Sequence, residues 1–271
     1  MIPASTVSGA SPRHRRGLWP RRTRVAVALC GCAPHRGGSP CGRTGSGPRP
    51  GRVRRAGPAL ALFALFAALF GLLLWALSAR DGAPIGPDRV LHHWAVAHRS
   101  ADLTAVAHLL DSTGAGPLPY IAVMLAGWTG CAHRTASRRE VSAALGAVVI
   151  LLTGQAVRLA VVFALARPRP PVTDWAVLST DWAFPSGYAT TSVLTAGLLA
   201  WAVLRSDAPR GAVRFDVLAC LLWAAAISAT RIYLGVQWPT DELGGWLLGT
   251  AWLALTLPIL SGLAGPAGRT L

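Results

Sequence analysis

Six apolar segments dominate this sequence from residue 56 onward. A helix of about 20 mostly apolar residues spans the hydrocarbon core of a bilayer, and each segment is close to that length. The segments cover residues 59–79, 116–132, 141–166, 187–204, 213–229 and 243–263. We therefore predict an all-α fold, that of a polytopic membrane protein with six transmembrane helices.

The composition agrees with a membrane domain and excludes two other classes of protein. Hydrophobic residues make up 52% of the chain and charged residues only 14%, whereas an average soluble domain has about 25% charged residues. An ordinary soluble globular protein is therefore excluded, and a chain that is disordered throughout is excluded more firmly.

Residues 1–55 differ in composition from the rest of the chain. They are rich in Gly, Pro, Ser and Arg and have no apolar periodicity, and the first acidic residue is Asp81. We interpret them as a disordered, arginine-rich cytoplasmic tail that contacts anionic lipid, followed by a membrane domain over residues 56–265. A start codon assigned too far upstream is the alternative.

The net charge of +15 raises the question of nucleic-acid binding. The basic blocks at residues 13–16 and 21–24 have no aromatic residue interleaved with them beyond Trp19, so we expect no nucleic-acid partner. The tail cysteines Cys30 and Cys32 lack a second pair at metal-ligand spacing. We expect neither a metal nor a cofactor.

Arginines near the ends of the apolar segments indicate the orientation, because cytoplasmic loops carry an excess of basic residues. If the tail is inside, loops 133–140 and 205–214 are also inside, and both are rich in arginine. We expect an integral protein of a bacterial plasma membrane with both termini cytoplasmic.

Residues 90–99, between the first two segments, have the mixed polarity of an amphipathic helix on the outer leaflet. This stretch contains His92, His93 and His98. We interpret the three histidines as interfacial side chains rather than metal ligands, because no carboxylate pattern completes a site.

Three polar clusters interrupt the apolar pattern, and the predicted orientation puts all of them on the outer face. They are residues 167–170 after the third segment, residues 184–188 at the start of the fourth, and residues 230–241 between the fifth and the sixth. The guanidinium groups of Arg167 and Arg169 match phosphate oxygens well. The helix start at Ser186 and Gly187 offers unpaired backbone N–H groups.

The third cluster adds Arg231 and the carboxylate of Asp241 at the same depth. Polar side chains at such positions are costly and are usually functional. Taken singly, each cluster also fits a structural role, such as an interfacial anchor or a helix N-cap. Together they predict a pocket for an anion, most naturally a phosphate.

The order and spacing of the clusters resemble the motifs of the type 2 phosphatidic acid phosphatases, which share a fold with the vanadium haloperoxidases. The family motifs run Lys-x6-Arg-Pro, Pro-Ser-Gly-His and Ser-Arg-x5-His-x3-Asp, and the resemblance covers about residues 85–260. It implies a six-span lipid phosphatase that needs no metal. The residues that it implies in phosphate binding are Arg167, Arg169, Ser186, Gly187 and Arg231.

The chain departs from the family at the residues that react. In the family, the histidine of the third motif attacks phosphorus and the aspartate four residues later orients its ring, while the histidine of the second motif protonates the leaving oxygen. Here Gln237 occupies the nucleophile position and Tyr188 the acid position, whereas Asp241 is retained. Val162 stands at the lysine position and Thr230 at that of the serine.

These replacements predict impaired catalysis. A glutamine amide cannot form the phospho-enzyme, because its nitrogen has no useful lone pair. Removal of the nucleophile from an enzyme of another class lowers the rate about a million-fold. Rescue by one of the outer histidines is the alternative.

The lost lysine has a candidate substitute in Arg158. Arg158 lies four residues before Val162 on the same helical face, about 12 Å from the helix end at ~1.5 Å per residue. An arginine this deep is expected to extend toward a polar pocket, so we predict that it is directed at the phosphate. A structural partner for buried carbonyl groups is the alternative.

These inferences converge on a lipid-phosphatase-like membrane protein whose outer-face pocket binds the phosphate or diphosphate headgroup of a lipid. An active phosphatidate or polyprenyl-diphosphate phosphatase with an unusual nucleophile is the first alternative, and a non-enzymatic membrane scaffold is the second. Membrane lipids are the expected partners. The sequence identifies neither the lipid nor the oligomeric state.

Overall fold

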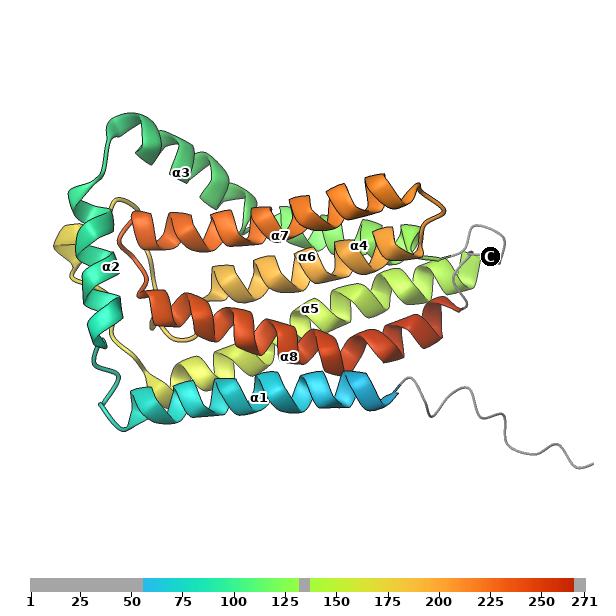
Figure 1. Cartoon of the computed structure of the whole chain (residues 1–271), viewed down its shortest axis with the longest axis horizontal. Coiled ribbons are helices and arrows are strands. Elements are labelled where there is room, and N and C mark those ends of the chain that lie inside the picture. The colour runs from blue at the N-terminus through green and yellow to red at the C-terminus, as the bar shows by residue number, and fades with distance from the viewer. Residues whose placement is uncertain (1–55, 132–136, 266–271) are drawn as a thin grey trace, which may run out of the picture. The chain divides into compact units, whose positions relative to one another are not determined.

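The computed structural model of this protein describes residues 56–131 and 137–265, and the regular secondary structure of these two stretches is entirely helical (Figure 1). The predicted all-α class is therefore confirmed. The arginine-rich tail predicted over residues 1–55 lies outside the described residues. The helices are α1 (Ala56–Ser78), α2 (Gly86–Ala97), α3 (Ala101–Thr113), α4 (Pro117–Thr129), α5 (Ser137–Leu165), the short 3-10 helix η2 (Val172–Asp174), α6 (Gly187–Arg205), α7 (Arg210–Tyr233) and α8 (Pro239–Ala264).

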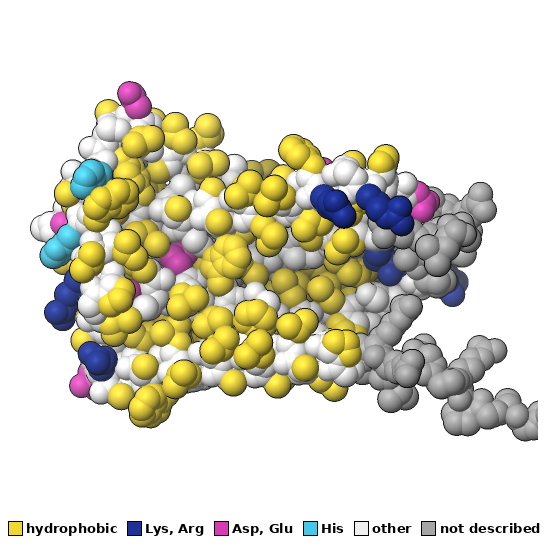
Figure 2. Space-filling view, in the orientation of Figure 1, with side chains coloured by type: hydrophobic (Ala, Val, Ile, Leu, Met, Phe, Trp, Pro, Cys, Tyr) yellow, Lys and Arg dark blue, Asp and Glu magenta, His cyan; other side chains and the backbone are white. Residues whose placement is uncertain are grey.

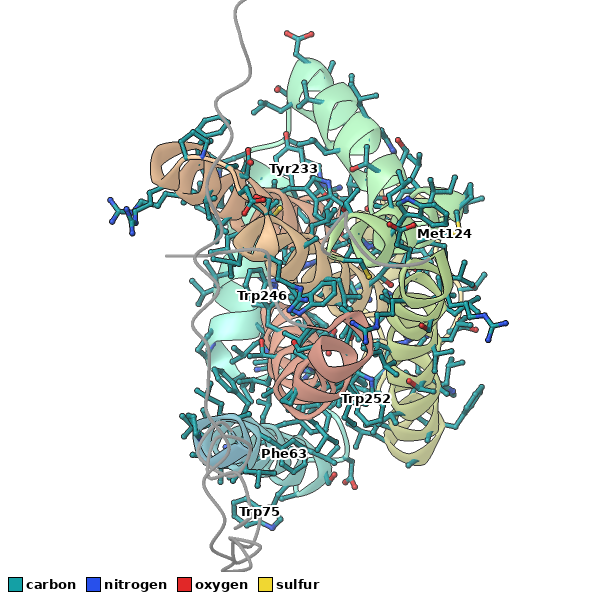
Figure 3. All side chains as sticks on the ribbon, turned by 90° about the vertical axis from the view of Figure 1, so that its right-hand side faces the viewer. Phe63, Trp75, Met124, Tyr233, Trp246 and Trp252 are labelled. Atoms are coloured by element: carbon teal, nitrogen blue, oxygen red, sulfur yellow. The ribbon has the colours of Figure 1, made fainter. Side chains whose placement is uncertain are left out.

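The long helices lie side by side in one bundle, and α2 lies across one end of it (Figure 1). Within the bundle, α6 packs against α4, α5, α7 and α8, while α8 packs against α1, α5 and α6. In the view along the bundle in Figure 3, Trp246 and Trp252 of α8 lie among the other helices, whereas Trp75 of α1 points away from them. The central helices are therefore α6 and α8, and the second and third polar clusters lie at their first turns.

Close packing of α8 on the start of α6 depends on glycine. A Cβ atom on Gly245 would lie 2.6 Å from the Cβ of Ala189 and 2.9 Å from the carbonyl oxygen of Ser186, which leaves no room for a side chain. Small residues at a helix interface allow this close approach. As a result, the backbone N–H of Ser186 donates a hydrogen bond to the carbonyl oxygen of Asp241 at 3.0 Å, and the two clusters meet.

Five helices of the described residues are long and apolar enough to span a membrane, namely α1, α5, α6, α7 and α8. They correspond to five of the six predicted segments. The remaining segment, predicted over residues 116–132, contains α4, which has only 13 residues. Gly116 has a φ of 67° and Pro117 starts a new helix, so the chain turns between α3 and α4. The count of six transmembrane helices stays a prediction.

The amphipathic helix expected over residues 90–99 is α2, which begins four residues earlier. Pro87 suits the first turn of a helix, and a side-chain oxygen of Asp88 accepts a hydrogen bond from the backbone N–H of Ile85 at 3.1 Å. Asp88 and His92 are buried against the bundle, whereas Trp94 is exposed. This pattern gives α2 one face that covers the bundle end and one that points away.

Arg167 joins three segments at this end of the bundle. The side chain is fully buried. Its Nη2 donates to Asp88 Oδ2 at 2.7 Å, and its Nη1 donates to Asp241 and to Thr240 Oγ1. Its Nε donates to the carbonyl oxygen of Gly82 at 3.0 Å. Because buried charges are tolerated only when partners satisfy them, this network holds the turn after α1, the helix α2 and the start of α8 in place.

We expect Arg167→Met to lower the free energy of unfolding by about 3–5 kcal/mol, because it leaves the buried carboxylates of Asp88 and Asp241 without their cation. The measurement is thermal unfolding of the purified protein in detergent. Arg89→Met, at an exposed arginine of α2, is the matched control and should change stability by no more than about 0.5 kcal/mol. Equal effects of the two substitutions would contradict this role of Arg167.

Candidate anion pocket

A cavity of about 310 Å³, called the pocket below, lies where α5, α6 and α7 meet the loop over residues 166–186 and the connection between α3 and α4. Six of the predicted site residues line it: Arg158, Arg169, Gly187, Tyr188, Arg231 and Gln237. The other three, Arg167, Ser186 and Asp241, are buried and do not line the pocket. All three polar clusters therefore contribute to one site, some of their residues as its walls and others as the support behind them.

The start of α6 faces the pocket. Ser186 is the N-cap residue, and its Oγ accepts a hydrogen bond from the backbone N–H of Ala189 at 3.3 Å, so this hydroxyl group serves the helix. Gly187 follows and lines the pocket. A helix start carries partial positive charge and unpaired N–H groups, and it therefore favours an anion at this position.

Arg169 uses all five of its N–H donors within the protein. The acceptors are the carbonyl oxygens of Thr180, Asp181, Trp182 and Val236 and the amide oxygen of Gln237. Burial, together with the nearby charge of Arg231, lowers the pKa of Arg169 to about 10, so the side chain remains charged at neutral pH. Arg169 thus clamps the loop over residues 180–182 against the segment before Gln237.

Gln237 is buried at the nucleophile position. In the amide orientation that satisfies every neighbouring donor and acceptor, its nitrogen donates to Asp241 Oδ2 and to the carbonyl oxygen of Ala183, both at 3.0 Å. Its oxygen accepts from Arg169 Nη1 at 2.8 Å. Asp241 therefore orients this amide as the resemblance implies for a histidine ring, although the amide nitrogen is not a nucleophile.

Arg231 lies over the ring of Tyr188. The guanidinium carbon is 4.0 Å from the centroid of the Tyr188 ring, which is a cation–π contact. Nη1 of Arg231 lies 3.2 Å from Asp111 Oδ2, and Nη2 donates to Ser179 Oγ at 3.1 Å. Its Nε is buried and has no hydrogen-bond partner among the described residues. The residue at the acid position thus lies against an arginine whose Nε is left unpaired within the described residues.

The ion-pair partner Asp111 was not identified from the sequence. It lies on α3, 120 positions before Arg231 in the chain, and its side chain is 8% exposed. Burial raises the pKa of this carboxyl group, and the charge of Arg231 opposes that rise. An isolated aspartate on a short helix carries no sequence signal for such a pairing, because the distance between the two segments arises only in the fold.

Arg158 is the lining arginine with the fewest internal hydrogen bonds. Its Nε is buried without a partner among the described residues, and its Nη1 reaches the carbonyl oxygen of Pro185 only at 3.5 Å. A Cβ atom on Gly187 would lie 2.9 Å from this Nη1, so the guanidinium group lies directly against the start of α6. Arg158 therefore places a positive charge at the point where the helix start also favours an anion.

The histidines of the 90–99 segment, His92, His93 and His98, do not line the pocket. His92 is buried, and its Nε2 lies 2.9 Å from Asp174 Oδ2. His93 and His98 are exposed on and after α2. The geometry therefore offers no support for a histidine that replaces the missing nucleophile. Within the described ranges, no group of three or more His, Cys, Asp and Glu side chains could hold a metal ion.

Comparison with known proteins gives three results. Residues 141–263 match the model of the PAP2 superfamily. A curated undecaprenyl-diphosphatase of Sulfolobus acidocaldarius is 32% identical over 75 residues, which are 28% of this chain and 32% of that protein. The match thus spans about a third of the relative's length.

The third result is a shared fold. The crystal structure of a transmembrane PAP2-type phosphatidylglycerolphosphate phosphatase from Bacillus subtilis aligns with a TM-score of 0.61 and 19% identity. The alignment covers 73% of this chain and 95% of that one. Residues 141–263 thus resemble the PAP2 superfamily, and the described helices share the fold of a transmembrane PAP2-type phosphatase.

Proposed function

We propose that this protein binds the phosphate or diphosphate headgroup of a membrane lipid in the pocket and does not hydrolyse it through a phosphohistidine. The observation that carries the proposal is the combination of Arg158 and Arg231 beside the start of α6 with Gln237 at the nucleophile position. The similar proteins described above are named for a lipid diphosphate and a phospholipid phosphate, and both compounds combine a phosphate group with a hydrocarbon chain.

The two arginine side chains Arg158 and Arg231 in the pocket wall support a ligand that is an anion. The Nε atoms of Arg158 and Arg231 are both buried without a partner among the described residues, and leaving such donors unpaired is costly. A phosphate group accepts several hydrogen bonds at once, and charge-assisted bonds of this kind are stronger than neutral ones. We assign Arg167, Arg169 and Ser186 to the support of the walls, because their donors and hydroxyl group already serve the protein.

The pocket is proposed to face the outer side of the membrane. Arg205, Arg210 and Arg214 lie around the connection between α6 and α7, at the other end of these helices from the pocket. Figure 2 shows arginine side chains at both ends of the bundle, so the occurrence of basic residues at one end does not by itself determine which end faces the cytoplasm. The support comes from their density near the α6–α7 connection and in the N-terminal sequence, which favours the cytoplasm for that side.

One prediction of this proposal concerns the binding role of Arg158. We expect Arg158→Gln to weaken binding of a short-chain phosphatidate by about 10- to 100-fold, because one or two charge-assisted hydrogen bonds are lost. The affinity is measured by isothermal titration calorimetry in detergent, with Arg89→Gln as the matched control at an exposed arginine. Unchanged affinity of the Arg158 variant would contradict this prediction and would leave Arg158 only a structural role, as a hydrogen-bond donor to the carbonyl group of Pro185. A wild-type protein that binds no phosphatidate would favour a scaffold.

A further prediction concerns the hydrolysis that the replacements at Gln237 and Tyr188 are proposed to prevent. We expect the double substitution Gln237→His and Tyr188→His to produce phosphate release from phosphatidate, at least about 100-fold above the wild-type background, because a nucleophile and an acid return to a site whose Asp241 is still in place. Adding Arg231→Ala should remove the gained activity. Wild-type turnover that Arg231→Ala abolishes would contradict the proposal and would favour a phosphatase with an unusual nucleophile.

A further inference from the structure

One acidic side chain, that of Asp181, stands among the described residues that line the pocket. The other charged residues of this lining are Arg158, Arg169 and Arg231. A carboxylate in the wall of an anion site repels a ligand that carries only negative charge, and it therefore selects against such a ligand. The charges of the pocket thus fit a ligand with charges of both signs better than a simple anion.

The backbone at Asp181 is held in an uncommon conformation. Its φ is 67°, in the left-handed region that glycine adopts without strain and that most other residues avoid. The neighbouring carbonyl groups are all bound by Arg169: its Nε donates to that of Asp181 at 3.0 Å. Its Nη2 donates to those of Thr180 at 2.9 Å and Trp182 at 3.3 Å. The pocket arginine Arg169 therefore fixes the turn that carries the carboxylate into the wall.

The carboxylate of Asp181 is available to a ligand. Within residues 56–131 and 137–265, the aspartates that form ion pairs are Asp88, Asp111, Asp174 and Asp241. The side chain of Asp181 is exposed, and it attracts the guanidinium groups of Arg158 and Arg169 without a direct ion pair. A negative charge thus lies near the positive charges at which the phosphate is proposed to bind.

We propose that the lipid headgroup in the pocket carries an ammonium group close to its phosphate, as in phosphatidylethanolamine, and that Asp181 binds this ammonium group. The inference rests on the function proposed above, because the phosphate occupies the site beside Arg158 and Arg231. In this headgroup, two carbon atoms separate the ammonium nitrogen from the nearest phosphate oxygen. One cavity of about 310 Å³ can therefore hold both charges.

The test compares two short-chain lipids that differ only in the charged group. Phosphatidylpropanol has the phosphodiester of phosphatidylethanolamine and a methyl group in place of the ammonium group. Isothermal titration calorimetry in detergent at neutral pH should show that the wild-type protein binds phosphatidylethanolamine about 2- to 5-fold more tightly, as expected for an ion pair with an exposed carboxylate. Asp181→Asn should abolish this preference, because it removes the charge, and asparagine also tolerates the left-handed backbone.

The matched control is Asp81→Asn. Asp81 is an exposed aspartate with a φ of 53°, and it does not line the pocket. This substitution should preserve the preference for phosphatidylethanolamine. Phosphatidate should respond to Asp181→Asn in the opposite direction, with an affinity about 2-fold higher, since a repulsive charge is removed. A purely structural role of Asp181 would not produce effects of opposite sign on the two lipids.

Three outcomes would overturn the proposal and leave phosphate binding intact, provided that phosphatidate still binds. They are equal wild-type affinity for phosphatidylethanolamine and phosphatidylpropanol, a preference that persists in Asp181→Asn, and an equal loss of affinity for all three lipids in that variant. A phosphatidate affinity that Asp181→Asn lowers only when magnesium is present would also overturn it, because a metal ion would then join Asp181 to the phosphate. A wild-type protein that binds none of the three lipids would instead overturn the proposed function itself.

Discussion

Both carboxylate oxygens of Asp241 are committed to partners within the protein, and the site depends on this. One oxygen pairs with the buried Arg167, and the other accepts from the backbone N–H of Trp238 at 2.9 Å and from the amide of Gln237. A carboxylate in the interior of a membrane domain is stable only with such a complete set of partners. The same residue therefore fixes the start of α8, the α2 end of the bundle and the side chain at the nucleophile position.

The arginines of the site fall into two groups according to where their N–H donors bind. Arg167 and Arg169 donate hydrogen bonds to carboxylates and carbonyl oxygens of the protein, so they determine the shape of the walls. Arg158 and Arg231 line the pocket and retain an unpaired Nε each. Tyr188, at the acid position, contributes a ring face that supports Arg231. Gln237 and Tyr188 are thus each held by contacts within the protein, Gln237 by hydrogen bonds and Tyr188 by its contact with Arg231, as the proposed binding site without hydrolysis requires.

Sequence reasoning reached the features that depend on local pattern. The apolar segments predict the helices, because apolar length is a property of one stretch of chain. The motif order brings residues 167–170, 184–188 and 230–241 together, as the pocket and its support show. The helix α4 is short because Gly116 and Pro117 make the chain turn before it. Both residues are visible in the sequence, but the apolar segment around them favours the opposite prediction, a transmembrane helix.

The features that escaped prediction depend on distance between remote segments. Asp88 and Asp111 lie on short helices before the matched family region, and each pairs with an arginine at least 79 positions later. For the same reason, the sequence could not distinguish an arginine that supports a wall from one that faces the cavity. Arg167 and Arg169 are two positions apart, yet only Arg169 lines the pocket.

A structure by electron cryo-microscopy in lipid nanodiscs containing phosphatidate tests the central claim most directly. Our account predicts phosphate density in the pocket within hydrogen-bond distance of Arg158 and Arg231, with Gln237 still donating to Asp241. Phosphatidate headgroups found only around the outside of the bundle, with the pocket closed by protein side chains, would contradict it.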